Sequence, residues 1–305
     1  MAPPLLTSET SKVSSPRLRV PERVRAALGL TPSGPHYFFF RHGWIVRVSH
    51  WVNALCLAIL LMSGLNIFNA HSALYWGETS NFDHPLLAIG TQYNDDGGIT
   101  AGIATIAGHP FNTTGFLGAS REDGQMTARG FPSWATLPGT NWLAMARQWH
   151  FAFAWLLVIN ALGFYVYGLV SLHFTRDLIP TAKDVSHLPK EILDHAQLKF
   201  HHGEEARHYN GLQKLAYCFV IFVLGPLVVL TGLTMSPTMD SAFPILLDIF
   251  GGRQSARVIH FLCAFAFFGF FLVHVAMVIL SGTWNNLRSM IIGWYAIRGK
   301  GHGHG

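Results

Sequence analysis

The sequence predicts an all-α protein, a membrane four-helix bundle with a long external loop region between helices one and two. Half of the residues are hydrophobic and only 12% are charged, whereas about 25% of the residues of a soluble domain are charged. The apolar residues form four blocks, and each is long enough to cross a bilayer, which takes roughly 20 helical residues. These observations argue against a soluble protein with one large core.

The elements follow one another in a simple order. Residues 1–40 are rich in Pro, Ser and Arg and lack apolar periodicity, which predicts a disordered basic arm. A membrane domain is expected over residues 41–298, and residues 299–305 are expected to be a flexible tail. Within the domain, residues 69–145 are too long for a simple turn and should fold as an external cap. The four spans are predicted at residues 48–68, 146–172, 215–235 and 258–281.

Lys and Arg are concentrated on one side of the predicted bundle. They are frequent in the N-terminal arm, between spans two and three and after span four, and sparse in the two other connections. Cytoplasmic segments carry this excess of positive charge. We therefore predict a multi-pass membrane protein, surrounded by lipid, with both termini cytoplasmic. The same distribution accounts for the net charge of +5, so nucleic acid is not an expected partner.

The three cysteines exclude several kinds of site. Cys56, Cys218 and Cys263 each lie within an apolar block, and the sequence contains no CxxC motif. The signatures of a cysteine zinc site, an iron–sulfur cluster and covalent haem attachment are therefore absent. Packing of buried thiols is the expected role.

Histidines are the more unusual feature, since the chain has seventeen of them. Four fall well within the predicted spans, and an ionisable residue inside a membrane helix is a functional candidate by default. His260 and His274 lie 14 residues apart in span four. At about 100° and 1.5 Å per residue they share one helix face and are separated by roughly 21 Å. The two others are His50 in span one and His150 in span two.

The depths of the four histidines predict two pairs. Given the orientation above, His50 and His274 lie near the inner surface, and His150 and His260 near the outer surface. Two imidazoles facing each other across a bundle suit bis-histidine ligation of a haem, so we expect two haem b groups with these axial ligands. Helix–helix hydrogen bonding is the alternative role for any one of these histidines. Zinc fits less well, because each level supplies only two ligands.

The sequence also resembles a known family. The relevant motifs are 47-RVSHW-51 at the start of span one, His150 at the start of span two, 208-HYNGLQK-214 before span three, the His260/His274 pair, and 286-NLRSMIIGW-294 after span four. Together they resemble the bacterial cytochrome b561-like family, which includes the di-haem cytochrome b subunits of nickel–iron hydrogenase, formate dehydrogenase and thiosulfate reductase. The resemblance covers all four spans and implies that the protein lies in the bacterial inner membrane.

The resemblance implies an electron-transfer subunit that connects a dehydrogenase, or another redox subunit at the outer face, with the membrane quinone. It also implies that the exchangeable quinone binds near the inner haem, where His208, Asn210, Gln213 and Lys214 would contact its carbonyls or relay protons. Helix capping and surface anchoring are the alternative roles of these four residues.

Two other functions remain open at this level. The chain could be a self-sufficient haem oxidoreductase that acts on superoxide or metal ions, or a haem-free membrane transporter or assembly protein. Whether it is an enzyme in its own right is therefore undecided by sequence. The external segment is longer than is usual for the family, and the basic arm is additional, so the partner's identity is also undecided.

Overall fold

The computed structural model describes residues 36–197 and 210–298, and this part of the chain is mainly helical. Four helices are long and apolar enough to span a membrane. They are α2 (Trp44–Asn69), α3 (Leu143–Val170), the continuous stretch Gly211–Thr234, and α9 (Arg253–Leu280). The prediction of four transmembrane helices is confirmed, with each predicted span lying within or almost within one of them.

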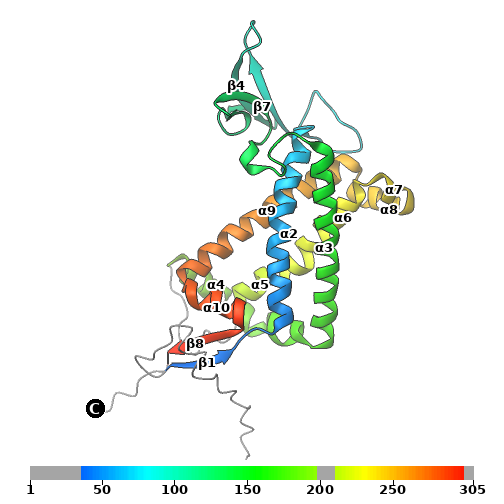
Figure 1. Cartoon of the computed structure of the whole chain (residues 1–305). Helices are drawn as coiled ribbons and strands as arrows, with labels where there is room; N and C mark the ends of the chain where they lie inside the picture. The colour runs from blue at the N-terminus through cyan, green and yellow to red at the C-terminus, as the bar shows by residue number, and fades with distance from the viewer. Residues whose placement is uncertain (1–35, 198–209, 299–305) are drawn as a thin grey trace, which may run out of the picture.

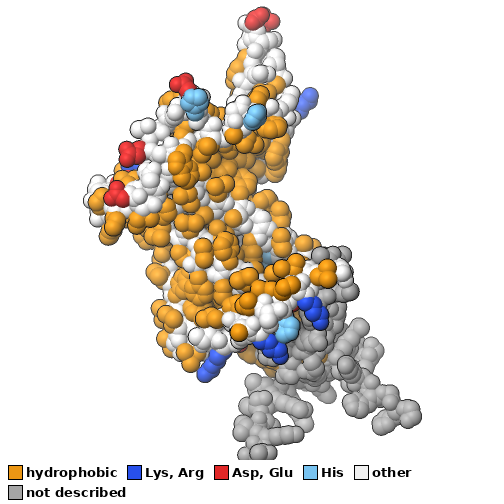
Figure 2. All heavy atoms as spheres, turned by 180° about the vertical axis from the view of Figure 1, so that it is seen from behind, with side chains coloured by type: hydrophobic (Ala, Val, Ile, Leu, Met, Phe, Trp, Pro, Cys, Tyr) orange, Lys and Arg blue, Asp and Glu red, His pale blue; other side chains and the backbone are white. Residues whose placement is uncertain are grey.

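The surface of the bundle suits a lipid environment. Large apolar side chains point outward along these helices, and Val170 of α3 is 81% exposed. Small polar side chains are buried between the helices instead, among them Ser63 of α2 and Thr231 of the third span. Figure 2 shows an apolar band around the middle of the molecule, with charged side chains gathered towards its two ends. An ordinary soluble protein has the opposite arrangement.

The third span is not one regular helix. It consists of α5 (Gly211–Phe219), a π-helical turn (Val220–Leu224) and α6 (Gly225–Thr234). Pro226 is the second residue of α6, and a proline cannot donate the backbone hydrogen bond that a regular α-helix requires. The π-turn therefore accommodates the proline, as such turns commonly do within helices.

The segment between α2 and α3 is rich in strands. The strands β2 (Ala73–Leu74), β3 (Leu87–Tyr93), β4 (Ile99–Ile106) and β5 (His109–Asn112) form an antiparallel sheet in this order. A hairpin of β6 (Gly118–Glu122) and β7 (Gln125–Arg129) packs beside it, and a 3₁₀ turn (Ser133–Ala135) follows. Figure 1 shows this cap projecting from one end of the bundle. We call this end the cap side.

The opposite end, which we call the terminal side, is closed by the two ends of the described chain. Strand β1 (His36–Phe40) pairs antiparallel with β8 (Trp294–Arg298) (Figure 1). Residues 36–40 were assigned to a disordered arm, and this assignment is wrong because they pair with a distant strand. Residues 1–35 and 299–305, predicted to be a disordered arm and a flexible tail, lie outside the described residues.

Short helices complete the two ends. On the terminal side a π-helical turn (Phe174–Leu178) follows α3, α4 (Ala182–Ala196) precedes α5, and α10 (Thr283–Ile292) follows α9. On the cap side α7 (Pro237–Ala242) and α8 (Ile245–Phe250) connect α6 with α9.

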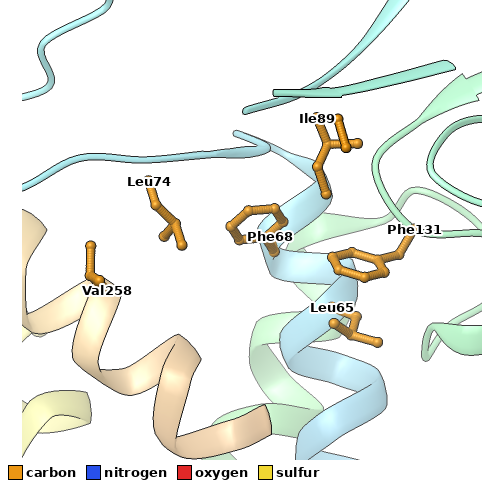
Figure 3. Packing of buried hydrophobic residues seen from close by; sticks show 7 residues of the cluster. Leu65, Phe68, Leu74, Ile89, Phe131 and Val258 are labelled. Atoms are coloured by element: carbon orange, nitrogen blue, oxygen red, sulfur yellow. The ribbon is translucent and has the colours of Figure 1, made fainter. Parts of the chain in front are cut away.

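A buried apolar cluster fixes the cap to the bundle. Leu65 and Phe68 of α2 and Val258 of α9 meet Leu74 and Ile89 of the cap sheet, with Ala104 and Phe131 completing the cluster (Figure 3). At its edge the side chain of Asn69 accepts a hydrogen bond from the Phe131 amide and donates one to the Phe131 carbonyl. Burial of each large side chain contributes about 1.5–3 kcal/mol, so the cap is a fixed part of the fold rather than a loose loop.

Candidate functional site

The structure brings the four intramembrane histidines together in two pairs. His50 of α2 and His274 of α9 have ring centroids 6.2 Å apart, and so do His150 of α3 and His260 of α9. The first pair lies six residues from the terminal-side ends of its helices, and the second lies seven residues from the cap-side ends. These are the pairs that the spacing predicts. We call them the terminal-side pair and the cap-side pair.

Hydrogen bonds fix the tautomer of His260. Its Nδ1 lies 2.9 Å from the carbonyl oxygen of Val228. A carbonyl can only accept, so Nδ1 carries the proton, and Nε2 keeps a lone pair for a metal. The hydroxyl of Thr231 lies 3.2 Å from the same Nδ1 and donates its own proton to the Leu227 carbonyl.

His150 is held in a similar way by a residue of α2. Its Nδ1 lies 3.0 Å from the hydroxyl of Ser63, and this hydroxyl donates to the carbonyl of Ile59 at 2.6 Å. Ser63 therefore accepts from Nδ1, and Nε2 of His150 is also left as a potential ligand atom. A hydroxyl residue on a neighbouring helix thus orients each ring of the cap-side pair.

A glycine follows each of these hydroxyl residues and allows the ring to approach the helix. A Cβ atom on Gly64 would lie 3.3 Å from Cε1 of His150, and one on Gly232 would lie 3.3 Å from Cε1 of His260. Both distances are tighter than ordinary carbon–carbon contacts. Ser63-Gly64 and Thr231-Gly232 therefore form matching cradles for the cap-side pair.

The terminal-side pair has different surroundings. The ring of His274 stacks on Phe270, with centroids 5.9 Å apart. The Nδ1 atom of His50 is buried and has no hydrogen-bond partner among the described residues. A buried polar atom without a hydrogen-bond partner costs folding free energy, so the His50 ring is suited to bind a further group.

The C-terminal segment holds the start of α2, and with it His50. The guanidinium of Arg47 donates to the Ile291 carbonyl at 2.6 Å, and the indole of Trp51 donates to the Met290 carbonyl at 3.1 Å. Gly293 then turns the chain with φ 87°, and a Cβ there would lie 2.9 Å from the His42 carbonyl oxygen. Only glycine fits easily at this position.

The donor set fits haem better than a bare metal ion. Among the described residues, no group of three or more His, Cys, Asp or Glu side chains is arranged to hold a metal ion. Each pair offers two imidazoles, and an iron porphyrin binds one such ligand on each of its two faces. A zinc site would require more protein ligands.

Three of the four residues expected to contact the quinone, Asn210, Gln213 and Lys214, lie at the start of α5. Asn210 caps this helix by accepting from the Gln213 amide at 2.8 Å, and the Gln213 side chain accepts from the Asn210 amide. The ammonium of Lys214 donates to the carboxylate of Asp184 at 2.9 Å, which lowers the pKa of Asp184 to about 2. His208 lies outside the described residues.

A further buried histidine lies at the terminal side. His42 precedes α2, and its burial lowers its pKa to about 3, with the neighbouring positive charge of Arg41 adding to this effect. The ring is therefore neutral at physiological pH, within electrostatic range of the terminal-side pair. Sequence reasoning left it outside the site, because nothing in 41-RHG-43 signals burial.

Two other histidines lie away from both pairs. His173 makes a hydrogen bond with Asp177 at 2.7 Å beyond the end of α3. His71 stacks on Tyr75 in the cap, with ring centroids 5.6 Å apart. Neither belongs to a facing pair of histidines.

Comparison with known proteins gives two findings. The family described as prokaryotic cytochrome b561 matches residues 41–293. Over 149 residues the chain is 37% identical to the "Putative protein-methionine-sulfoxide reductase subunit YedZ1" of Azospira oryzae. This alignment covers 49% of the present chain and 71% of that protein.

Proposed function

The chain belongs to the prokaryotic cytochrome b561 family, and from this premise we propose that it is a di-haem cytochrome b. It passes electrons between the membrane quinone pool on its terminal side and a redox partner on its cap side. The terminal side faces the cytoplasm, in line with the distribution of Lys and Arg. Membership in the family implies haem b.

The observation that carries the proposal is the sorting of four histidines into two facing pairs at different depths. His260 and His274 share one face of α9, and each has its own partner on α2 or α3. Helix–helix hydrogen bonding accounts for the Nδ1 atoms of the cap-side pair, which bond to Ser63 and Val228 of neighbouring helices. It does not account for the way each ring faces a second histidine.

The chain's residues hold and orient the ligands. His150 and His260 would bind the cap-side haem, with Nδ1 fixed by Ser63 and by the Val228 carbonyl, and His50 and His274 would bind the terminal-side haem. When bound, haem b would supply one-electron chemistry, and with both imidazoles of a pair bound to it the iron would have no free position for oxygen. This ligation favours electron passage over oxygen chemistry.

The quinone is placed on the terminal side, at the start of α5. The Lys214 ammonium is held there by Asp184, and Asn210 and Gln213 fix the helix terminus beside it. An ammonium has three donors, so Lys214 is suited to donate to a quinone carbonyl. His208 precedes this group in the sequence.

The redox partner is a reductase or dehydrogenase subunit at the cap side. The relative from Azospira oryzae is named as a subunit of a reductase, which favours a multi-subunit complex over a self-sufficient oxidoreductase. The test is quinol-driven reduction in lipid nanodiscs: a short-chain quinol should reduce the haem, followed by its α-band absorbance. Failure of the quinol to reduce haem that dithionite does reduce would contradict the quinone half of the proposal.

The hydroxyl contact to His150 should tune the cap-side haem. Ser63→Ala removes an acceptor for Nδ1–H, makes the imidazole a weaker donor to ferric iron and so raises the midpoint potential. The shift is roughly 20–60 mV, since a hydrogen bond contributes about 0.5–1.5 kcal/mol and a one-electron couple changes by about 59 mV per tenfold in equilibrium constant.

Thr231→Val is the matched control for this change. In this variant His260 keeps the Val228 carbonyl as an acceptor. The midpoint potential of the cap-side haem should therefore shift less than in Ser63→Ala. Spectroelectrochemical titration measures both. Equal shifts, or a downward shift in Ser63→Ala, would show that the hydroxyl does not act through Nδ1.

A further inference from the structure

One loop of the cap is fastened to the helix that carries His260. Residues 75–86, which we call the anchored loop, connect β2 with β3. The carbonyl of Gly77 accepts from the amides of Gln254 and Ser255, each at 3.1 Å, and the Gly77 amide donates to the Ser255 hydroxyl at 2.7 Å. A Cβ on Gly252 would lie 2.7 Å from the Gly77 oxygen. The loop is therefore fixed against the first turn of α9.

The anchored loop exposes large aromatic side chains next to carboxylates. Trp76 is 62% exposed and Phe82 is 73% exposed, and the side chains of Glu78 and Asp83 beside them are exposed as well. Exposed aromatic residues with a polar rim are typical of protein interfaces. Insertion between lipid headgroups explains the loop less well, because the carboxylates have the wrong charge for anionic lipid.

The exposed end of the loop leads inward through contacting rings. Phe82 lies 5.7 Å from Tyr75 and 6.0 Å from His71 between ring centroids, and these two rings stack on each other. Tyr75 is buried. The exposed ring of Phe82 is thus in contact with a buried ring.

From His71 the contacts continue to the cap-side pair. Arg257 donates to the His71 carbonyl at 2.5 Å, and its guanidinium lies 5.4 Å from the centre of the Phe68 ring. Phe68 lies 5.0 Å from Phe261, the residue that follows His260. Because electron tunnelling weakens steeply with distance, a partner docked on the anchored loop would be well placed to exchange electrons with a haem held by this pair.

The charge of the cap indicates what kind of partner fits. Residues 69–145 contain six acidic residues and two arginines. One of these, Arg129, is buried and paired with Glu122. Acidic side chains are visible at this end of the molecule in Figure 2. A partner with a basic contact face would be steered towards such a surface.

We propose that the anchored loop is the docking surface of the cap-side redox subunit, and that the contact face of this subunit is basic. Trp76 and Phe82 form the apolar centre of the contact, and Glu78 and Asp83 form its charged rim. The inference rests on the proposed function, since it names the chemistry of the cap-side partner.

The test uses the full chain in nanodiscs and a basic c-type cytochrome as the probe. Glu78→Gln/Asp83→Asn should lower the second-order rate of electron exchange at low salt by about 3–10-fold and flatten its dependence on ionic strength. Asp95→Asn/Asp96→Asn is the matched control. It removes the same charge at the exposed turn between β3 and β4, and should change the rate less.

A second variant separates the apolar contact from charge. Trp76→Ala/Phe82→Ala should lower the rate with the salt dependence retained, and the haem spectrum should stay unchanged, which shows that the fold is intact. Equal effects of the two acidic double variants, or no exchange between the wild-type chain and the basic cytochrome, would overturn the docking proposal. Quinol-driven reduction of the same samples reports on the proposed function separately, because it does not involve the loop.

Discussion

Replacing His260 with alanine should reduce the haem content from two to one per chain and leave the terminal-side haem in place. His274→Ala should have the reverse effect. The physical reason is that each haem depends on two imidazoles from different helices, and the two levels share only α9. The measurement is the haem-to-protein ratio, together with a redox titration that identifies the remaining component.

His173→Ala serves as the control, because this histidine lies beyond the end of α3, where it hydrogen-bonds to Asp177, and belongs to neither pair. It should retain both haems. If His260→Ala or His274→Ala lost both haems while the protein stayed folded by circular dichroism, the pairing would be wrong. Retention of both haems in either variant would show that the ligands lie elsewhere.

The second large effect concerns the route of the electrons. In His274→Ala, a quinol should no longer reduce the cap-side haem, because the terminal-side haem that lies between them is missing. The rate of quinol-driven reduction should fall by two orders of magnitude or more, given that the two levels are roughly 21 Å apart along α9. Dithionite should still reduce the remaining haem.

The reciprocal variant is the control for this experiment. His260→Ala keeps the terminal-side pair, so quinol should reduce its remaining haem at a rate close to that of the wild type. If both variants were reduced equally fast by quinol, electrons would enter at both levels. The assignment of the quinone to the terminal side would then be incorrect.

The sequence was sufficient to predict the membrane helices and the pairing of the histidines. Apolar blocks of bilayer length leave few alternatives to a helix, because every backbone polar group must be satisfied within the membrane. The separation of 14 residues between His260 and His274 is nearly four helical turns. Once the depths were known, only one pairing of the four residues was geometrically simple.

Features that depend on distant contacts were not accessible in this way. The pairing of β1 with β8 joins residues near opposite ends of the chain, and nothing local in 36-HYFFF-40 specifies its partner. The cap was expected as a folded segment, but its strand order rests on pairings that sequence alone did not reveal.

The orienting residues of the cap-side pair were missed for a related reason. Ser and Thr in membrane helices commonly donate back to their own helix, so Ser63 and Thr231 did not stand out. Gly64 and Gly232 are two of several glycines within the spans, and nothing local distinguishes them. The recurrence of a hydroxyl residue followed by glycine in spans one and three was the available signal, and it became meaningful once the histidines faced it.

The most direct test of the account is the haem-to-protein ratio of the purified wild-type chain, taken with its reduced-minus-oxidised spectrum. The account predicts two haem b groups per chain, with spectra typical of two axial histidines. A chain that contains no haem, or a single haem that survives replacement of all four paired histidines, would contradict it.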